Sequence, residues 1–145
     1  MGTVQSTDAA QHARWVEGRV LNMEPNVIVS RECEDVEGLG FGKVGVQGTL
    51  DHQVVDAEIT VKFVGIAVLD TTRPTGKYEQ YETAALMKKG VIVVQASVAV
   101  AVGDPVYYVP ATGVLTNVVG ANTLIAGATW DTSTAGAGLA ALRLG

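Results

Sequence analysis

The sequence has a single cysteine, and this limits both its covalent chemistry and its redox chemistry. With Cys33 as the one thiol in 145 residues, an internal disulfide is excluded. Cys33 lies within the acidic stretch 31–35, where neighbouring carboxylates disfavour the thiolate that a nucleophile requires. The pattern favours an inert structural or surface thiol.

The sequence also lacks a long apolar run. A membrane helix needs roughly 18 to 20 uninterrupted apolar residues. The stretch 91–102 comes closest, but Gln95 and Ser97 interrupt it. Residues 1–15 lack the basic start and apolar core of a secretory signal. We therefore expect a soluble protein that is cytoplasmic where it is made and has no membrane partner.

Positive charge is scarce as well. The net charge is −5. A nucleic-acid-binding protein neutralises phosphates with clustered lysine and arginine, so this balance argues against a direct nucleic-acid partner.

Charge of either sign is nearly absent from the second half of the chain. Between Gly90 and Leu142 the charged residues are Asp104 and Asp131, whereas 22 of the 25 charged residues precede Gly90. In a small monomer a large share of the residues reaches the surface, where charged side chains are common, so a segment of this length with so little charge is unusual. Either this half forms central strands covered by uncharged polar residues, or another subunit or protein covers its surface. We favour the second interpretation because interface cores are depleted in charge.

Short β-branched runs separated by turns dominate the sequence from Tyr78 onward. Residues 83–87 lead into Lys88-Lys89-Gly90, which predicts a hairpin turn into a second strand at 91–96. Gly103-Asp104-Pro105 predicts a further turn.

The rest of the chain follows the same pattern. We expect further strands at Val27–Ser30, Phe41–Gln47, Glu58–Leu69, Val106–Val109, Val114–Leu115, Thr123–Trp130 and Leu139–Leu144. Residues 48–56 are expected to form a turn-rich link, and residues 70–81 a long polar loop. This layout predicts an all-β fold, an antiparallel β-sandwich or barrel and possibly a jelly roll. Residues 1–13 are expected to form an extended, flexible N-terminal arm, and residues 14–145 a single β domain.

No catalytic, cofactor or metal site is predicted. Gly40, Gly42 and Gly45 spell a dinucleotide-binding pattern, but they lead into a strand rather than a helix. An enzyme using His52 with Asp51 and Asp56 is conceivable, yet no further ligands follow at a recognisable spacing.

Contact residues are expected in the loop 70–81, because adaptable loops on a rigid β scaffold usually carry binding residues. Tyrosine and arginine are favoured in such contacts. An ordinary solvated connection is the alternative. The predicted contacts with a partner protein or another subunit are Arg73, Pro74, Lys77, Tyr78 and Tyr81, together with Trp15 as the first packed residue.

Six short segments, in their order and spacing, resemble the structural cement, or head-decoration, proteins of tailed bacteriophages. The segments are 46–48, 63–70, 74–81, 89–93, 103–108 and 111–116. The resemblance extends from about Val27 to the end of the sequence.

This resemblance implies a non-enzymatic β protein on the outer surface of an icosahedral capsid. It would bind at junctions between subunits of the major capsid protein and stabilise the shell. It would also associate with itself, as a homotrimer first and a homodimer second. The alternative is a carbohydrate- or host-binding β module using the aromatic residues Tyr78, Tyr81, Tyr107, Tyr108 and Trp130.

Overall fold

A computed structural model describes residues 16–21, 24–56, 62–73 and 75–145. The expected arm at residues 1–13 lies outside this range, as do Trp15 and Pro74. The described residues are all-β, as the sequence predicts, and no helix among them is long and apolar enough to cross a membrane. The strands are β1 (Val27–Cys33), β2 (Leu39–Gly40), β3 (Val44–Gln47), β4 (Gln53–Asp56), β5 (Phe63–Ala67), β6 (Lys77–Tyr78), β7 (Thr83–Ala96), β8 (Pro105–Tyr108), β9 (Leu115–Thr116), β10 (Thr123–Trp130) and β11 (Gly138–Leu144).

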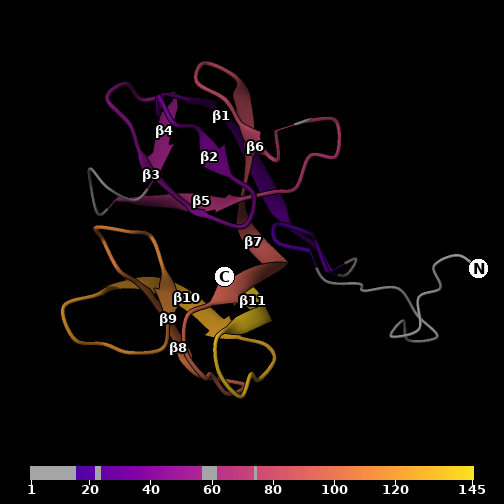
Figure 1. Cartoon of the computed structure of the whole chain (residues 1–145), viewed down its shortest axis with the longest axis vertical. Coiled ribbons are helices and arrows are strands. Elements are labelled where there is room, and N and C mark those ends of the chain that lie inside the picture. The colour runs from indigo at the N-terminus through magenta and orange to yellow at the C-terminus, as the bar shows by residue number, and fades with distance from the viewer. Residues whose placement is uncertain (1–15, 22–23, 57–61, 74) are drawn as a thin grey trace, which may run out of the picture.

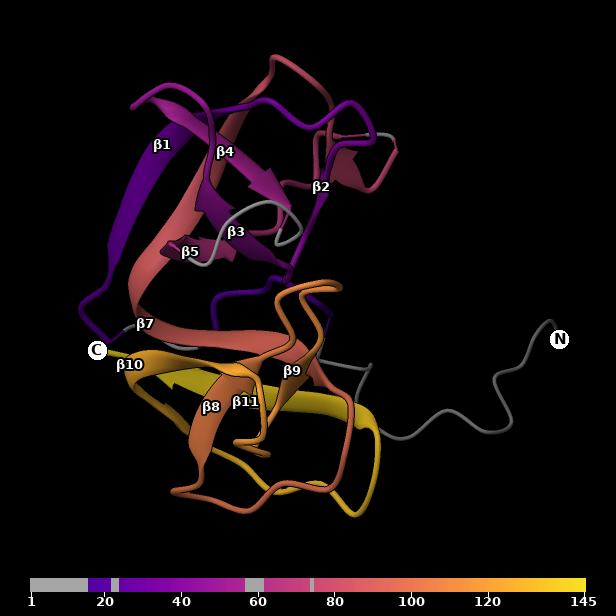
Figure 2. The ribbon, with the colours of Figure 1, turned by 90° about the vertical axis from the view of Figure 1, so that its left-hand side faces the viewer.

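Nine of the strands form one sheet that closes on itself twice. The order is β1-β4-β3-β5-β7-β11-β10-β8-β9, and β7 also pairs with both β1 and β9. The result is two barrels that share β7, stacked along the long axis of the molecule (Figures 1 and 2). We call β1, β3, β4, β5 and residues 83–89 of β7 the N-terminal barrel. Residues 90–96 of β7 with β8–β11 form the C-terminal barrel.

Strand β7 replaces the hairpin expected around Lys88-Lys89-Gly90, and that prediction is wrong. The chain continues as one strand of 14 residues. Its first half pairs with β1 and β5, and its second half pairs with β11. Gly90 has a φ of +126° at the point where the partners change. A glycine here bends the strand from one barrel into the next instead of reversing it.

Strand β4 lies within residues 48–56, where the sequence predicts only a link. Its four residues pair antiparallel with β3 and parallel with β1. A tight turn precedes it, in which Gly48 N–H donates to Gln53 O at 3.0 Å and Gln53 N–H donates to Leu50 O at 3.0 Å. Only Val54 and Val55 mark it as a strand, and two apolar residues are too few to show an alternating pattern.

The larger hydrophobic cluster extends through both barrels. It contains Ile66 and Met87 from the N-terminal barrel and Ile92, Tyr108 and Trp130 from the C-terminal barrel, all fully buried. A smaller cluster fills the rest of the N-terminal barrel around Leu39, Tyr78 and Leu86. Because one core crosses the boundary, the barrels pack against each other as well as sharing a strand.

Candidate interaction site

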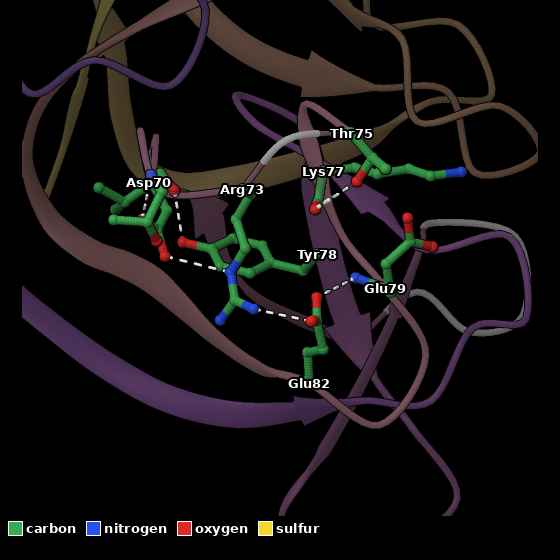
Figure 3. A network of polar contacts seen from close by, with 9 residues as sticks. Asp70, Arg73, Thr75, Lys77, Tyr78, Glu79 and Glu82 are labelled. Carbon is green, nitrogen blue, oxygen red and sulfur yellow. Dashed lines mark hydrogen bonds and ion pairs between the residues drawn. The ribbon is translucent and has the colours of Figure 1, made fainter.

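Arg73 is the centre of a polar network in the loop 70–81, on the N-terminal barrel. Its Nε lies 3.2 Å from Asp70 Oδ2, and its Nη1 lies 2.8 Å from Glu82 Oε2 (Figure 3). The guanidinium carbon also lies 5.5 Å from the centre of the Tyr78 ring, within cation–π range. Arg73 thus holds the two ends of the loop together through Asp70 and Glu82.

Asp70 is fixed in its ionised form by the residues that follow it. The Thr72 hydroxyl donates to Asp70 Oδ1 at 2.6 Å, and the Thr72 N–H donates to the same oxygen at 3.0 Å. These bonds, with a smaller contribution from Arg73, hold the pKa of the Asp70 carboxyl below its usual range. The carboxylate is therefore available to pair with Arg73 at neutral pH.

Tyr78 anchors the loop to the core. Its ring is 2 % exposed and meets Phe41 edge-on, with centroids 5.2 Å apart. Its hydroxyl donates to Val68 O at 2.6 Å. Burial raises the pKa of this hydroxyl. Tyr78 was predicted as a contact residue, and the structure places its side chain in the interior.

Tyr81 is the predicted tyrosine of this loop that reaches solvent, with 67 % of its surface exposed. It has a φ of +69°, a conformation that is uncommon outside glycine. The Tyr81 N–H donates to Cys33 O at 2.6 Å, which ties this backbone to β1. Lys77 is in the same loop, and its Nζ donates to Glu37 O at 2.7 Å on the protein surface.

A hollow of about 500 Å³ lies beside the network. Val16, Phe41 and Leu69 give it an apolar lining, and Glu17, Lys43 and Arg73 lie around them. Gly18 sets Glu17 in place, because its N–H donates to Val93 O and its carbonyl accepts from Leu69 N–H, each at 2.8 Å. Glu17 Oε2 lies 3.0 Å from Lys43 Nζ. The charges at the hollow are thus paired with each other, an arrangement suited to packing against a surface.

The residues considered for chemistry lie on β4, on the turn before it, and on the stretch that leads from β2 into β3. His52 Nε2 lies 3.6 Å from Glu32 Oε1 on the exposed turn before β4. The described part of the chain contains no cluster of metal-ligating side chains. The glycines at 40, 42 and 45 lead into β3, a strand.

Three of the five aromatic residues proposed for carbohydrate binding are core residues. Tyr78, Tyr108 and Trp130 are at most 2 % exposed. Burial also raises the pKa of Tyr108. A sugar-stacking platform needs exposed rings, so these three side chains are not available to form one.

A second surface lies on the C-terminal barrel, and none of its residues is among the contacts predicted from the sequence. We call it the uncharged surface and define it by Val102, Val118, Val119 and Leu124, which are 50–64 % exposed. The missing charge after Gly90 signals this surface in the sequence, although it does not identify the residues that face outward.

The fold and these surfaces can be compared with known proteins. A family model described as "Structural cement protein (E217 gp24/Pam3 gp6)" matches residues 4–145. Among solved structures, one described as the capsid of Myoviridae phage XM1 matches with a TM-score of 0.76 and 19% identity, covering 98% of this chain and 97% of that chain. The head fiber gp8.5 N base of bacteriophage phi29 matches with a TM-score of 0.52 and 12% identity, covering 82% and 95%. The comparison with curated proteins found no match. At these identities the structural matches establish a shared fold.

Proposed function

Because this chain belongs to the phage structural cement protein family, we propose that it binds the outer surface of an icosahedral head and stabilises the shell there. Its sites would be the junctions between subunits of the major capsid protein. The observation that carries the proposal is the family match over residues 4–145. The family is a structural one, and a virion structural role follows from membership.

The physical mechanism is the sum of many small contacts. Each buried Å² of apolar surface contributes about 25 cal/mol, and the contribution repeats with every copy bound to the shell. The entropy lost on association opposes this gain, so affinity per copy is lower than the area suggests. A net charge of −5 suits an exterior position, away from packaged DNA.

Contact with the shell is proposed for the loop 70–81. Arg73 and its partners fix this loop, which favours binding because a preordered loop loses little entropy on docking. Tyr81 and Lys77 would provide the outward contacts from this loop. Trp15, Pro74 and an arm at residues 1–13 remain predicted contacts outside the described residues.

The test uses expanded capsids that lack decoration. Adding purified protein is expected to raise the temperature at which these capsids disrupt. A Tyr81→Ala variant is expected to bind the shell more weakly, whereas Ile28→Ala, at an exposed position on β1 of the same barrel, is not. Deletion of residues 3–12 is expected to reduce occupancy and leave the fold intact. If the full chain neither binds these capsids nor changes their disruption temperature, the proposal fails.

A further inference from the structure

Residues 16–21 lie where the two barrels meet and form hydrogen bonds to both of them (Figure 2). From these bonds we infer that the segment, which we call the latch, holds the two barrels in one fixed orientation. Its functional role rests on the cement role proposed above, because a decoration protein restrains a shell only as far as it resists deformation itself. Stabilisation of the shell would therefore require a closed latch.

Without the latch, the connection between the barrels has little directional support. From β1 to β11 the strands pass from one barrel to the other once, at Gly90 in β7. Gly90 has a φ of +126°, and a residue without a Cβ restricts the backbone least. The shared hydrophobic cluster holds the barrels together, but apolar contact is non-directional and does not by itself fix one angle. A fixed orientation needs directional bonds across this boundary.

Gly18 forms such bonds to both barrels from a single residue. Its N–H donates to Val93 O in the C-terminal barrel, and its carbonyl accepts from Leu69 N–H, just after β5 of the N-terminal barrel, each at 2.8 Å. Gly18 has a φ of +83°, and a Cβ there would lie 2.8 Å from Phe41 Cβ and 2.9 Å from Gly42 N. Glycine is therefore required both by the conformation and by the space.

The rest of the latch extends the pairing along β7. Arg19 O accepts a hydrogen bond at 2.9 Å and Leu21 N–H donates one at 3.1 Å, both with residues 91–93 of β7. Between them, Val20 pairs antiparallel with Ile92 and packs against the larger hydrophobic cluster. Strand β11 pairs with the same part of β7, so the latch lies along the opposite side of this strand.

Two ion pairs accompany the latch, one on each barrel. Glu17 Oε2 lies 3.0 Å from Lys43 Nζ, just before β3. Glu24 forms a two-point ion pair with Arg143 of β11, in which Nη2 lies 3.0 Å from Oε2. All four side chains are partly exposed, and exposed ion pairs contribute little. The backbone bonds of Gly18, Arg19 and Leu21 therefore account for most of the strength of the latch.

The latch is tested in the full chain with two variants that open it in different ways. Gly18→Ala places a Cβ against Phe41 and the backbone of Gly42. Leu21→Pro removes the N–H that bonds to β7 and leaves Gly18 in place. Gly103→Ala is the matched control, because its φ of +90° is similarly strained but a Cβ there would meet nothing within 4 Å.

Hydrogen exchange shows whether the latch has opened. The amides of Leu69 and Val93 are expected to exchange at least about 100-fold faster in Gly18→Ala, and that of Val93 in Leu21→Pro, than in the wild type or the control. The amide of Trp130, which donates to Asp104 O within the C-terminal barrel, is expected to stay protected and so to show that this barrel remains folded. Exchange that stays slow in both variants would overturn the inference, because the latch would not depend on these bonds.

The orientation of the barrels is measured as a distance between two nitroxide labels. Leu50→Cys, in the turn between β3 and β4, and Leu124→Cys, on β10, place one label at an exposed position of each barrel, and the native Cys33 is buried. A narrow distance distribution is expected in the wild type and in Gly103→Ala, and a broader one in Gly18→Ala and Leu21→Pro. Folded variants with fast exchange and an unchanged distribution would overturn the inference.

Heat disruption of undecorated capsids tests the functional role of the latch. The variants with an open latch are expected to reach wild-type occupancy on the shell and to lose most of the rise in disruption temperature, whereas Gly103→Ala keeps it. A full rise with an open latch would overturn this role, and so would a loss of binding, because the latch would then belong to the contact surface. If the wild type itself does not bind capsids, the cement role fails, and the label distances still decide whether the latch exists.

Discussion

Tyr78 and Tyr81 are three positions apart, yet the first side chain is buried and the second is exposed. The Tyr78 ring packs against Phe41 in the core, and its hydroxyl is hydrogen-bonded to Val68 O. Tyr81 is two-thirds exposed. Sequence reasoning grouped them because both are aromatic residues in one polar loop. Nothing in the local pattern shows that β6 turns one ring inward.

Tyr78→Phe is expected to lower the free energy of unfolding by about 1 to 2 kcal/mol, because it removes a buried hydrogen bond and keeps the ring. Tyr81→Phe is the control and is expected to change stability very little. Urea unfolding followed by circular dichroism measures both. Equal effects of the two substitutions would contradict the anchoring role of Tyr78.

The low reactivity of the Cys33 thiol was predicted from the sequence. The thiol is buried in β1, and burial raises its pKa, with nearby acidic residues adding to the shift. A protonated, buried thiol is a poor nucleophile. The acidic neighbours were visible in the sequence, and burial now adds the larger effect.

At the scale of elements, β7 determines the architecture because both barrels close on it. Gly90 is the residue at which the strand changes partners. A Cβ at this position would lie 2.7 Å from the Cβ of Asn26, and the φ of +126° disfavours any L side chain.

Gly90→Ala is therefore expected to lower the free energy of unfolding by at least about 2 kcal/mol. Gly103→Ala is the matched comparison. Its φ of +90° is also strained, but a Cβ there would meet nothing within 4 Å, so a loss of about 1 kcal/mol is expected. Denaturant unfolding measures the pair. Hydrogen exchange of Gly90→Ala is expected to show weakened protection in both barrels, and weakening confined to one would contradict the shared role of β7.

The strands that could be predicted from sequence are those with enough apolar residues to show a pattern. Thr123–Trp130 was predicted at the bounds it has in the structure, and Leu139–Leu144 falls one residue short of β11. The break at Gly90 was misassigned because the same glycine that permits a turn also permits a bend, and only the pairing partners distinguish them. Strand β4 was missed because its two valines are recognisable as a strand only from their pairing partners. These are β1, which is distant in sequence, and β3, which precedes the tight turn.

At the scale of the whole molecule, ionised carboxylates stabilise both barrels. Hydrogen bonds from Thr49 lower the pKa of Glu34, and those from Asn117 and Ala101 lower the pKa of Asp104. Together with Asp70, these groups have folded-state pKa values below their ordinary values of 4.5 and 3.8. Their contribution is present above the ordinary values and is lost as the pH falls through the folded-state values.

We therefore expect the Tm to fall as the pH is lowered below about 5, with little change due to these groups above pH 5. Asp104→Asn is expected to make this fall shallower, because the amide accepts the same hydrogen bonds without titrating. Calorimetry across this pH range measures the effect. A constant Tm down to pH 3 in the wild type would contradict the stabilising role of these carboxylates.

The charge distribution was the most informative whole-molecule feature of the sequence. It located the division between the two halves at Gly90, where the structure passes from one barrel to the other. The charge distribution could not show that each half closes into a barrel. Closure depends on the pairing of β7 with β1 and with β9, and a sequence pattern does not reveal pairing between distant segments.

The double closure on β7 has a further consequence for a protein that would crowd a surface in many copies. Each of the nine strands in the large sheet has two or more hydrogen-bonded neighbours. An open sheet side would offer its unpaired amides and carbonyls to adjacent molecules and could seed fibrous aggregates at high local concentration. Many copies could therefore pack closely on a particle without strand pairing between the large sheets of neighbouring molecules.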